Sequence, residues 1–331
     1  MTIFTLSRRA AIVGATLLAM LPASSALAFE PSASECIAPA NAGGGWDFTC
    51  RQVGKLLYDL KLVPDPVQVT NLAGGGGGVA YAEVVSKRND DNNLIVAASS
   101  ATSTRLAQGA FPGMNMDMVR WIGSVGTDYG VIAVSAKSDI KTLPELMDKV
   151  KADPKSVSFA GGSAVGGWDH LKILIAAQAA GIEDVRTIKY VAFEGGGEAV
   201  TQLLGDHVQA FSGDISEARG FVDSGDIRVL AVLAKDRLPG VFASFPTAKE
   251  QGIDAVGANW RGFYAPGNMS DDAYGFWTGA INKLNASPEW KKIQDESGLV
   301  PLDLSGADFQ QFVAEQVAKT TELSKKIGLI K

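Results

Sequence analysis

The chain is poor in the residues that build metal and redox centres. Two histidines and two cysteines among 331 residues leave little material for a histidine-rich metal site. Positive charge is also scarce, because 30 lysines and arginines stand against 36 aspartates and glutamates, and no basic block interrupts the chain. An acidic chain without such a block argues against nucleic acid or an anionic membrane surface as partner. We therefore expect no cofactor, no metal site and no nucleic-acid partner.

Long apolar runs are missing beyond the N-terminus, where residues 10–21 form a run too short for a permanent membrane helix. Arg8 and Arg9 precede this run, and Ala26-Leu27-Ala28 has the small-x-small form of a signal-peptidase site. These features predict a secretory signal over residues 1–28, cleaved after Ala28. The remaining 303 residues carry a formal net charge of −8, from 28 basic and 36 acidic side chains.

The predicted export bears on whether the two cysteines form a disulfide. In an oxidising compartment Cys36 and Cys50 can form a disulfide, and the closed loop of about 15 residues would stabilise the fold by roughly 3 kcal/mol. Two free buried thiols are the alternative. A catalytic cysteine is disfavoured because no histidine lies nearby in the sequence and the partner thiol would oxidise it.

Glycine, in contrast, is abundant and clustered. It accounts for 37 residues, about 11% against the usual roughly 7%. Fifteen of the 37 stand in five short clusters, at residues 43–45, 74–78, 161–162, 166–167 and 195–197.

Short apolar runs alternate with helical patterns along the chain, which predicts an α/β fold with mainly parallel strand pairing. A length near 300 residues favours two domains. Residues 53–60 carry a helical stripe, and Thr142-x-x-Glu145 and Ser305-x-x-Asp308 resemble capping boxes. The predicted strands lie at 67–70, 94–98, 131–134, 157–160, 188–191, 208–211 and 229–233.

One short motif is repeated in the two halves. Gly44-Gly45-Trp46-Asp47 recurs as Gly166-Gly167-Trp168-Asp169, and a second glycine cluster follows Asp47 after 27 residues and Asp169 after 26. A period above 100 residues indicates a duplicated domain and excludes a solenoid. A chance match is the alternative, and the agreement in spacing argues against it.

Such loops suit the binding of anions. Glycine at the carboxyl end of a strand lets backbone N–H groups approach a ligand, and a helix that begins just after the loop adds unpaired N–H groups and roughly half a positive charge. Two domains that face each other with such loops would present several positive helix ends to one small polycarboxylate.

Three other readings of the glycine loops fail in detail. No Walker motif is present, and Gly75-x-Gly77-x-x-Ala80 lacks the acidic residue that would hold a ribose. A secreted α/β hydrolase would rely on Ser163, with Asp169 and His170 nearby, but adjacent helix residues do not face each other and the final glycine of a nucleophile elbow is missing.

Several segments together resemble the periplasmic substrate-binding proteins of tripartite tricarboxylate transporters, closest to the citrate-binding branch. The likeness covers the mature chain and is carried by ECIAPA-x-x-GGGWD-x-TC at 35–50, VRWIGSVGTDYG at 119–130, YVAFEGGGE at 190–198, IRVLAV at 227–232 and FPTAKEQG at 245–252. It implies a non-enzymatic, periplasmic, monomeric protein with a two-lobed type II periplasmic binding protein fold and an interdomain ligand cleft. A tricarboxylate such as citrate would be captured there and passed to a transporter with large and small membrane subunits. A dicarboxylate or an aromatic carboxylate such as terephthalate is the alternative ligand.

The resemblance also places domains and a site. Lobe one is expected at 29–129 and 260–331, and lobe two at 130–259. Asp47 and Asp169 would repel an anion, so capping of their own helices is preferred over water-bridged contact, and Tyr129 is favoured over Arg261 as the ligand contact near the crossing. The expected ligand-binding residues are Gly43, Gly44, Gly45, Trp46, Asp47, Gly75, Gly76, Ser99, Ser100, Thr102, Tyr129, Gly162, Ser163, Val165, Gly166, Asp169, Glu194 and Asp214.

Overall fold

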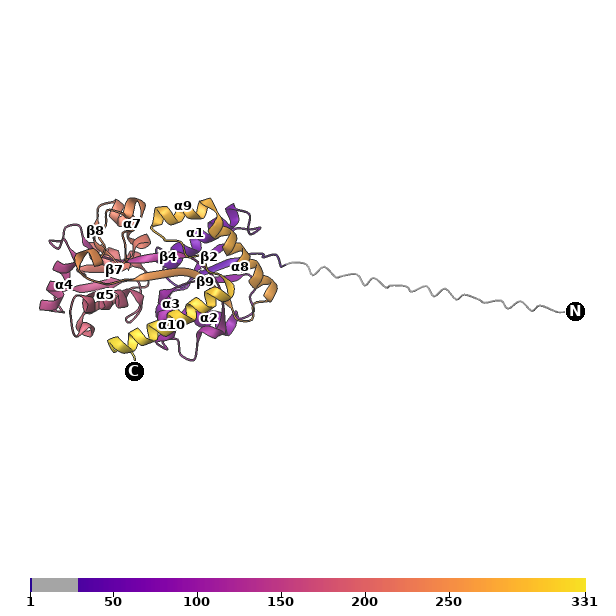
Figure 1. Ribbon diagram of the computed structural model, residues 1–331, viewed down its shortest axis with the longest axis horizontal. Helices are drawn as coiled ribbons and strands as arrows, with labels where there is room; N and C mark the ends of the chain where they lie inside the picture. The colour runs from indigo at the N-terminus through magenta and orange to yellow at the C-terminus, as the bar shows by residue number, and fades with distance from the viewer. Residues whose placement is uncertain (2–28) are drawn as a thin grey trace.

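The computed structural model describes residue 1 and residues 29–331, which fold into two lobes joined by long strands (Figure 1). The predicted secretory signal, apart from Met1, lies outside the described residues. Among those residues, no helix is long and apolar enough to cross a bilayer.

The described chain contains nine strands and ten α-helices, which alternate from β1 to β8. The strands are β1 (Glu35–Ala38), β2 (Gln68–Asn71), β3 (Leu94–Ser99), β4 (Val119–Ser135), β5 (Ser158–Gly161), β6 (Lys189–Ala192), β7 (Ala210–Asp214), β8 (Ile227–Val232) and β9 (Ala258–Pro266). The helices are α1 (Gly45–Asp59), α2 (Gly78–Lys87), α3 (Ser100–Ala107), α4 (Leu143–Ala152), α5 (Trp168–Ala179), α6 (Gly196–Leu204), α7 (Ile215–Asp223), α8 (Asp271–Ala286), α9 (Pro288–Ser297) and α10 (Gly306–Ile327).

The strands form one curled sheet in the order β2-β1-β3-β9-β4-β7-β5-β6, with β8 paired to β4 as well. Pairing is parallel among β1, β2 and β3 and among β5, β6 and β7, which confirms the predicted parallel arrangement inside each lobe. The strands that connect the lobes depart from it, because β4 and β9 run antiparallel to their neighbours.

Strand β4 carries the chain from one lobe to the other. Its residues 119–129 pair with β9 in the first lobe, and residues 130–135 pair with β7 and β8 in the second. The register shifts twice in the first part, between Trp121 and Gly123 and between Ser124 and Gly126. Such bulges increase the local twist of a strand and so help the sheet to curl.

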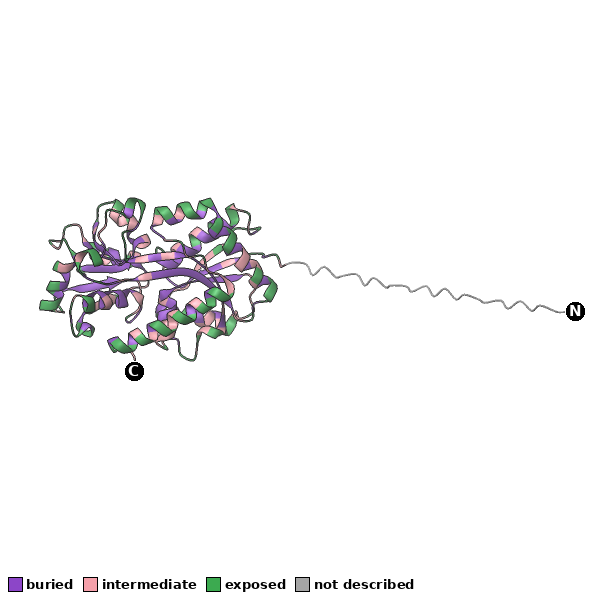
Figure 2. Ribbon diagram, viewed as in Figure 1, coloured by how far each residue is buried: buried purple, intermediate pink, exposed green. Residues whose placement is uncertain are grey.

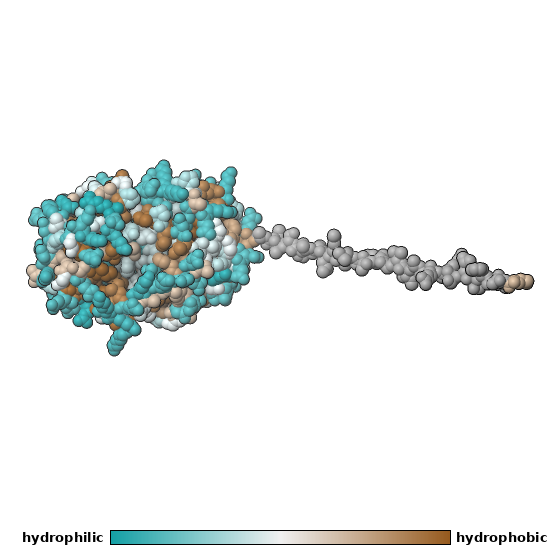
Figure 3. All heavy atoms as spheres, viewed as in Figure 1, coloured by the Kyte–Doolittle hydropathy of each residue, from teal (hydrophilic) through white to brown (hydrophobic). Residues whose placement is uncertain are grey.

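Both faces of the sheet are covered by helices, so the inner strands are buried on both sides (Figure 2), whereas β2 and β6 at the ends of the sheet are partly exposed. In the first lobe Trp277 and Trp290 belong to one apolar cluster and Trp121 and Phe309 to another, on the other side of the sheet. Burial of a side chain of this size contributes roughly 1.5–3 kcal/mol. The face drawn in Figure 3 is mainly hydrophilic, with apolar side chains in small areas.

Helix α10 contacts both lobes. Its first half places Phe309 and Val313 in the core of the first lobe, whereas Ile327 at its end belongs to a core cluster of the second. The side chain of Gln108 at the end of α3 donates hydrogen bonds both to Ser324 of α10 and to the carbonyl of Gly166. The predicted division of the chain into 29–129 with 260–331 and 130–259 stays a prediction.

Candidate functional site

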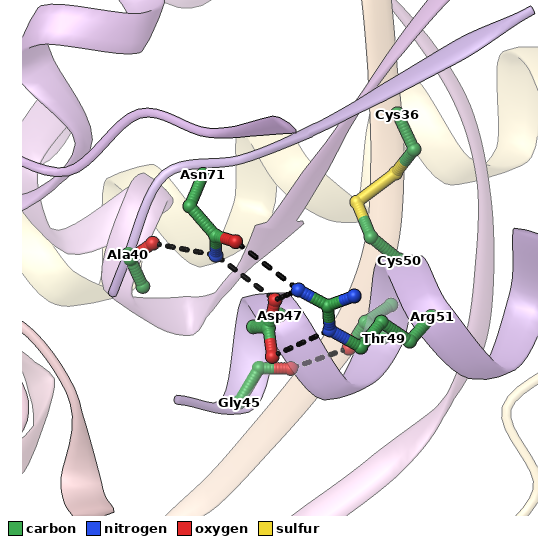
Figure 4. The surroundings of a disulfide bond; sticks show 8 residues. All are labelled: Cys36, Ala40, Gly45, Asp47, Thr49, Cys50, Arg51 and Asn71. Atoms are coloured by element: carbon green, nitrogen blue, oxygen red, sulfur yellow. Dashed lines mark hydrogen bonds and ion pairs between the residues drawn. A yellow bond between two sulfur atoms is a disulfide. The ribbon is translucent and has the colours of Figure 1, made fainter. Parts of the chain in front are cut away.

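The first glycine loop is fixed between β1 and α1 by the predicted disulfide, which the structure confirms (Figure 4). The Cα atoms of Cys36 and Cys50 lie 5.7 Å apart and both side chains are buried. Because Cys36 lies in β1 and Cys50 in α1, the bond holds the start of the helix against the sheet.

Asp47 holds the same loop together from within. One carboxylate oxygen accepts the N–H of Gly43 at 3.0 Å. The other accepts Asn71 Nδ2 at 2.9 Å (Figure 4). Arg51 donates to the same carboxylate, and although burial opposes ionisation, these hydrogen bonds hold the pKa of Asp47 below its usual range. Asp47 therefore fixes the loop and takes no place in the cavity wall.

The two loops that carry the repeated motif have the same local geometry, but the structural alignment differs from the sequence alignment by one residue. Gly43 and Gly166 share a left-handed φ, at 84° and 80°, and each donates its N–H to a side chain four residues later. That acceptor is Asp47 in the first loop and His170 Nδ1 in the second. His170, rather than Asp169, is thus the structural counterpart of Asp47, which leaves the carboxylate of Asp169 available for other partners.

The helices that follow the glycine clusters begin without side-chain caps. Gly44, Gly77, Gly167 and Gly195 stand at the N-caps of α1, α2, α5 and α6, and none offers a side chain to the free N–H groups. Hydroxyls cap α3, α4, α8 and α9, as at Ser270 before α8. The predicted capping box Ser305-x-x-Asp308 is wrong, because the Ser305 side chain makes no cap hydrogen bond at the start of α10. A helix start without a cap side chain carries a partial positive charge and leaves its N–H groups to acceptors from elsewhere, as when Ser163 Oγ accepts the N–H of Asp169 in α5.

A small cavity of about 30 Å³ lies between the lobes at three of these starts, those of α1, α5 and α6. Eight of the predicted ligand-binding residues line it: Gly44, Gly45, Trp46, Ser99, Gly162, Ser163, Asp169 and Asp214. The other lining residues are Ala40, Ala101, Trp168, Gly195, Glu217, Asn259 and Arg261.

Several predicted residues of the first lobe, inside the cavity wall and outside it, have structural partners. Ser99 and Thr102 form a capping box for α3, and Trp46 Nε1 donates to Ser99 Oγ at 3.1 Å. The hydroxyl of Ser100 accepts the N–H of Trp260. The 3₁₀ turn Gly75–Gly77 lies outside the cavity wall, where a Cβ on Gly76 would lie 3.2 Å from Ala164.

The remaining predicted residues lie at the hinge and at the rim of the cleft. Tyr129 packs against the core of the second lobe. The carbonyl of Val165 accepts Arg105 Nη1, and that of Gly166 accepts Gln108 Nε2. Glu194 contacts the opposite lobe through its carbonyl, which accepts the N–H of Asn41 at 2.9 Å. These contacts join the two lobes around the cavity.

Charged side chains form a network behind and beside the cavity. Arg261 of β9 donates through Nη2 to Asp128 and to Asp214, each at 2.8 Å, and Lys172 of α5 pairs with Asp169 at 2.8 Å and Asp214 at 2.7 Å. All five residues are buried. Arg261 Nε has no hydrogen-bond partner.

Negative charge exceeds positive charge in this network. Glu217 adds a fourth carboxylate to those of Asp128, Asp169 and Asp214, against the two cations Arg261 and Lys172. Burial, with the neighbouring Asp214 and Asp169, raises the pKa of Glu217 to about 7. Although burial opposes ionisation of Asp214 too, Lys172 and Arg261 lower its pKa, so Asp214 loses its proton more readily than Glu217.

Glu217 crosses the cleft from the second lobe. Its Oε1 accepts the N–H of Gly45, the first residue of α1, at 2.8 Å. Its Oε2 accepts the N–H of Asp214 at 3.2 Å, which completes a capping box at the start of α7. Sequence reasoning missed Glu217, although Asp214-x-x-Glu217 at a strand end is itself a capping-box signal that places a glutamate in the first turn of a helix.

The residues considered for nucleophilic catalysis hydrogen-bond to the backbone. Ser163 Oγ accepts the N–H of Asp169 at 3.0 Å, and His170 Nδ1 accepts that of Gly166 at 3.0 Å. Burial lowers the pKa of His170 to about 4, and its ring stacks on Tyr190. Among residues 29–331, no cluster of three or more acidic, histidine or cysteine side chains has the arrangement of a metal site.

The sequence matches the model of the tripartite tricarboxylate transporter family receptor over residues 51–329. It is 27% identical to the UPF0065 protein in gbd 5′region of Cupriavidus necator over 210 residues, 63% of this chain and 62% of that protein. Protein BugT of Bordetella pertussis is 26% identical over 300 residues, 89% of each chain. The alignments span less than two thirds of the UPF0065 proteins of C. necator and B. pertussis, 62% and 65% of their lengths.

Solved structures share the fold. The periplasmic binding protein BugD has a TM-score of 0.81 at 23% identity, over 90% of this chain and 98% of its own. MatC from Rhodopseudomonas palustris with bound malate has a TM-score of 0.77 at 18% identity, over 88% and 98%. An R. palustris protein with adipate has a TM-score of 0.80 at 19% identity, over 89% and 97%. These likenesses confirm the predicted two-lobed binding-protein fold.

Proposed function

Because this chain belongs to the family of tripartite tricarboxylate transporter receptors, we propose that it is an exported solute-binding protein that captures a small carboxylate between its lobes. It acts in the periplasm as a monomer and without catalysis. It delivers its ligand to a membrane transporter with one large and one small membrane subunit.

The observation that carries this proposal is the meeting of bare helix starts from both lobes at one cavity. Helix α1 comes from the first lobe and α5 and α6 from the second, and each begins after a glycine that offers no side-chain cap of its own. Carboxylates are stabilised at such helix ends. Arg261 in the cavity wall adds a cationic side chain whose Nε donor has no partner.

Capture works by closure of the lobes. Carboxylate contacts to helix starts on both sides stabilise only the closed arrangement, so ligand binding shifts the equilibrium toward it. The two walls already touch in the structure, with Asn41 N–H donating to Glu194 O and Asn41 Nδ2 to Glu198 Oε1 at 2.7 Å. These rim contacts need the closed geometry and add to its stability.

A tricarboxylate such as citrate is the first candidate ligand, from the sequence resemblance and the family. MatC is described with malate and another neighbour with adipate, so dicarboxylates are the second candidate and an aromatic carboxylate such as terephthalate is the third. Each added ligand charge meets the carboxylates of Asp169, Asp214 and Glu217, which disfavours the most highly charged acids.

A thermal-shift panel of citrate, tricarballylate, malate, adipate and terephthalate tests the proposal. A ligand at about 100 times its dissociation constant should stabilise the fold by roughly 2.7 kcal/mol. A shift with malate, adipate or terephthalate but not with citrate or tricarballylate would replace the tricarboxylate assignment. No shift with any acid, together with ester hydrolysis that Ser163→Ala abolishes, would replace binding by a hydrolase activity.

A further inference from the structure

The carboxylate of Glu217 occupies the place where the fold is best prepared for an anion. It accepts the N–H of Gly45 at the bare start of α1 and that of Asp214 at the start of α7. It also lies against the start of α6, because a Cβ on Gly196 would come within 2.8–2.9 Å of its carboxyl atoms. Three helix starts from two lobes therefore surround one side-chain carboxylate.

This contact differs from that of Glu145, the glutamate of the capping box of α4. Glu145 at the third position of α4 accepts only N–H groups of its own N-terminal turn, from Lys141 and Thr142. Glu217 has the same position in α7, yet only one of its oxygens serves its own helix. The other reaches 172 residues back in the sequence and joins the lobes.

The cavity left beside Glu217 is too small for the proposed ligands. Its 30 Å³ holds two or three water molecules at roughly 10–15 Å³ each, far less than a citrate needs. One strong donor in its wall is unused, since Arg261 is 3% exposed and its Nε has no partner. The wall thus retains a buried cationic donor while the neighbouring N–H groups are already engaged by Glu217.

We propose that Glu217 is a resident surrogate for a ligand carboxylate, which holds the cleft closed across Gly45 and must be displaced before a ligand carboxylate can take the start of α1. Glu217 then determines specificity, because a ligand must outcompete an intramolecular carboxylate and each further negative charge on it is repelled. The closure part, that Glu217 holds the cleft closed, depends only on its contact with Gly45. The specificity part, that Glu217 selects among ligands, rests on the proposed function.

Small-angle X-ray scattering of the protein purified without carboxylates tests the closure part. The wild-type radius of gyration should match the closed structure, and Glu217→Ala should increase it. Glu145→Ala removes a glutamate from the same helix position outside the cleft and should leave the radius of gyration unchanged. A wild-type protein that is already open, or a Glu217→Ala variant as compact as the wild type, would overturn the proposal.

Calorimetric titration with citrate and malate tests the specificity part. Glu217→Gln keeps one of the two acceptor oxygens and removes the charge, so its affinity for citrate should rise at least tenfold, and less for malate. Glu145→Gln should bind both acids as the wild type does. Unchanged or weaker citrate binding by Glu217→Gln, where the wild type binds citrate, contradicts the specificity part. Failure of wild type and variant alike to bind either acid counts against carboxylate capture, while scattering still decides whether Glu217 closes the cleft.

Discussion

Replacing Arg261 by methionine should strongly destabilise the protein. The guanidinium is buried and paired with Asp128 and Asp214. Because both carboxylates are buried too, water cannot solvate them when the arginine is removed. Asp214 keeps Lys172 and Asn259 as partners, but Asp128 is left with the hydroxyl and N–H of Ser216. A buried carboxylate that loses its cation in this way costs about 3–5 kcal/mol.

Urea unfolding followed by tryptophan fluorescence at pH 7 measures this cost. The matched control is Arg186→Met, which breaks the ion pair of Arg186 with Asp184, whose side chains are 60% and 55% exposed. An exposed pair of this kind contributes at most about 1 kcal/mol. A loss below about 1 kcal/mol for Arg261→Met would refute the reasoning, because Asp128 would then have been stable without its partner.

The double variant Arg261→Met, Asp128→Asn separates charge from packing. If the lost cation is the cause, removing the stranded charge of Asp128 should recover at least about 1 kcal/mol relative to the sum of the single changes. The cost of Arg261→Met should also shrink as the pH falls, because burial and the neighbouring Asp214 already raise the pKa of Asp128 and loss of the arginine raises it further. Additive effects at all pH values would point to lost packing alone.

Three further changes test other parts of the structure. Replacing Cys36 and Cys50 together by serine should lower the free energy of unfolding by about 3 kcal/mol, and dithiothreitol should then have no further effect on the variant. Gly44→Ala places a Cβ 3.3 Å from the Cα of Gly195 on the opposite lobe, so calorimetry should show at least tenfold weaker citrate or malate binding; unchanged affinity would contradict tight closure at this point. Because the pKa of Glu217 is raised from 4.5 to about 7, its protonation favours the folded state below pH 4.5 and this contribution is lost as the pH rises through 7. The free energy of unfolding of the wild type, measured relative to that of Glu217→Gln, should therefore fall between pH 5 and 8. The fall is at most about 3 kcal/mol, and it is smaller because solvent reaches the partly exposed carboxylate. A difference that does not change with pH would show that the pKa of Glu217 is ordinary.

Much of the fold was predictable because it follows local rules. Each predicted strand overlaps an observed one, and the Thr142-x-x-Glu145 signal marks the observed capping box of α4. The strand β9 was not predicted, since its antiparallel pairing with β3 and β4 depends on residues more than 120 positions away. Its Arg261 and Asn259 nevertheless supply part of the cavity wall.

The site was predictable in its backbone and less so in its side chains. Glycine clusters and helix patterns are local, so the bare helix starts could be located from sequence. The repeated motif predicted an alignment that is wrong by one residue. The sequence match aligns Asp47 with Asp169, whereas in the structure Asp47 and His170 are equivalent, because each accepts the N–H of a left-handed glycine four residues earlier. Glu217 was missed because its role depends on Gly45 in the other lobe, a proximity that only the folded chain creates.

Helix α10 has a consequence for the engineering of this scaffold. The chain passes between the lobes through β4 and β9, and the packing of Ile327 adds a third connection at the C-terminus. Neither lobe is therefore an independent module that a single cut could release. A chimaera that takes lobe two from a relative must also take the last turn of α10, or its grafted core will lack the side chain that the far end of the chain supplies.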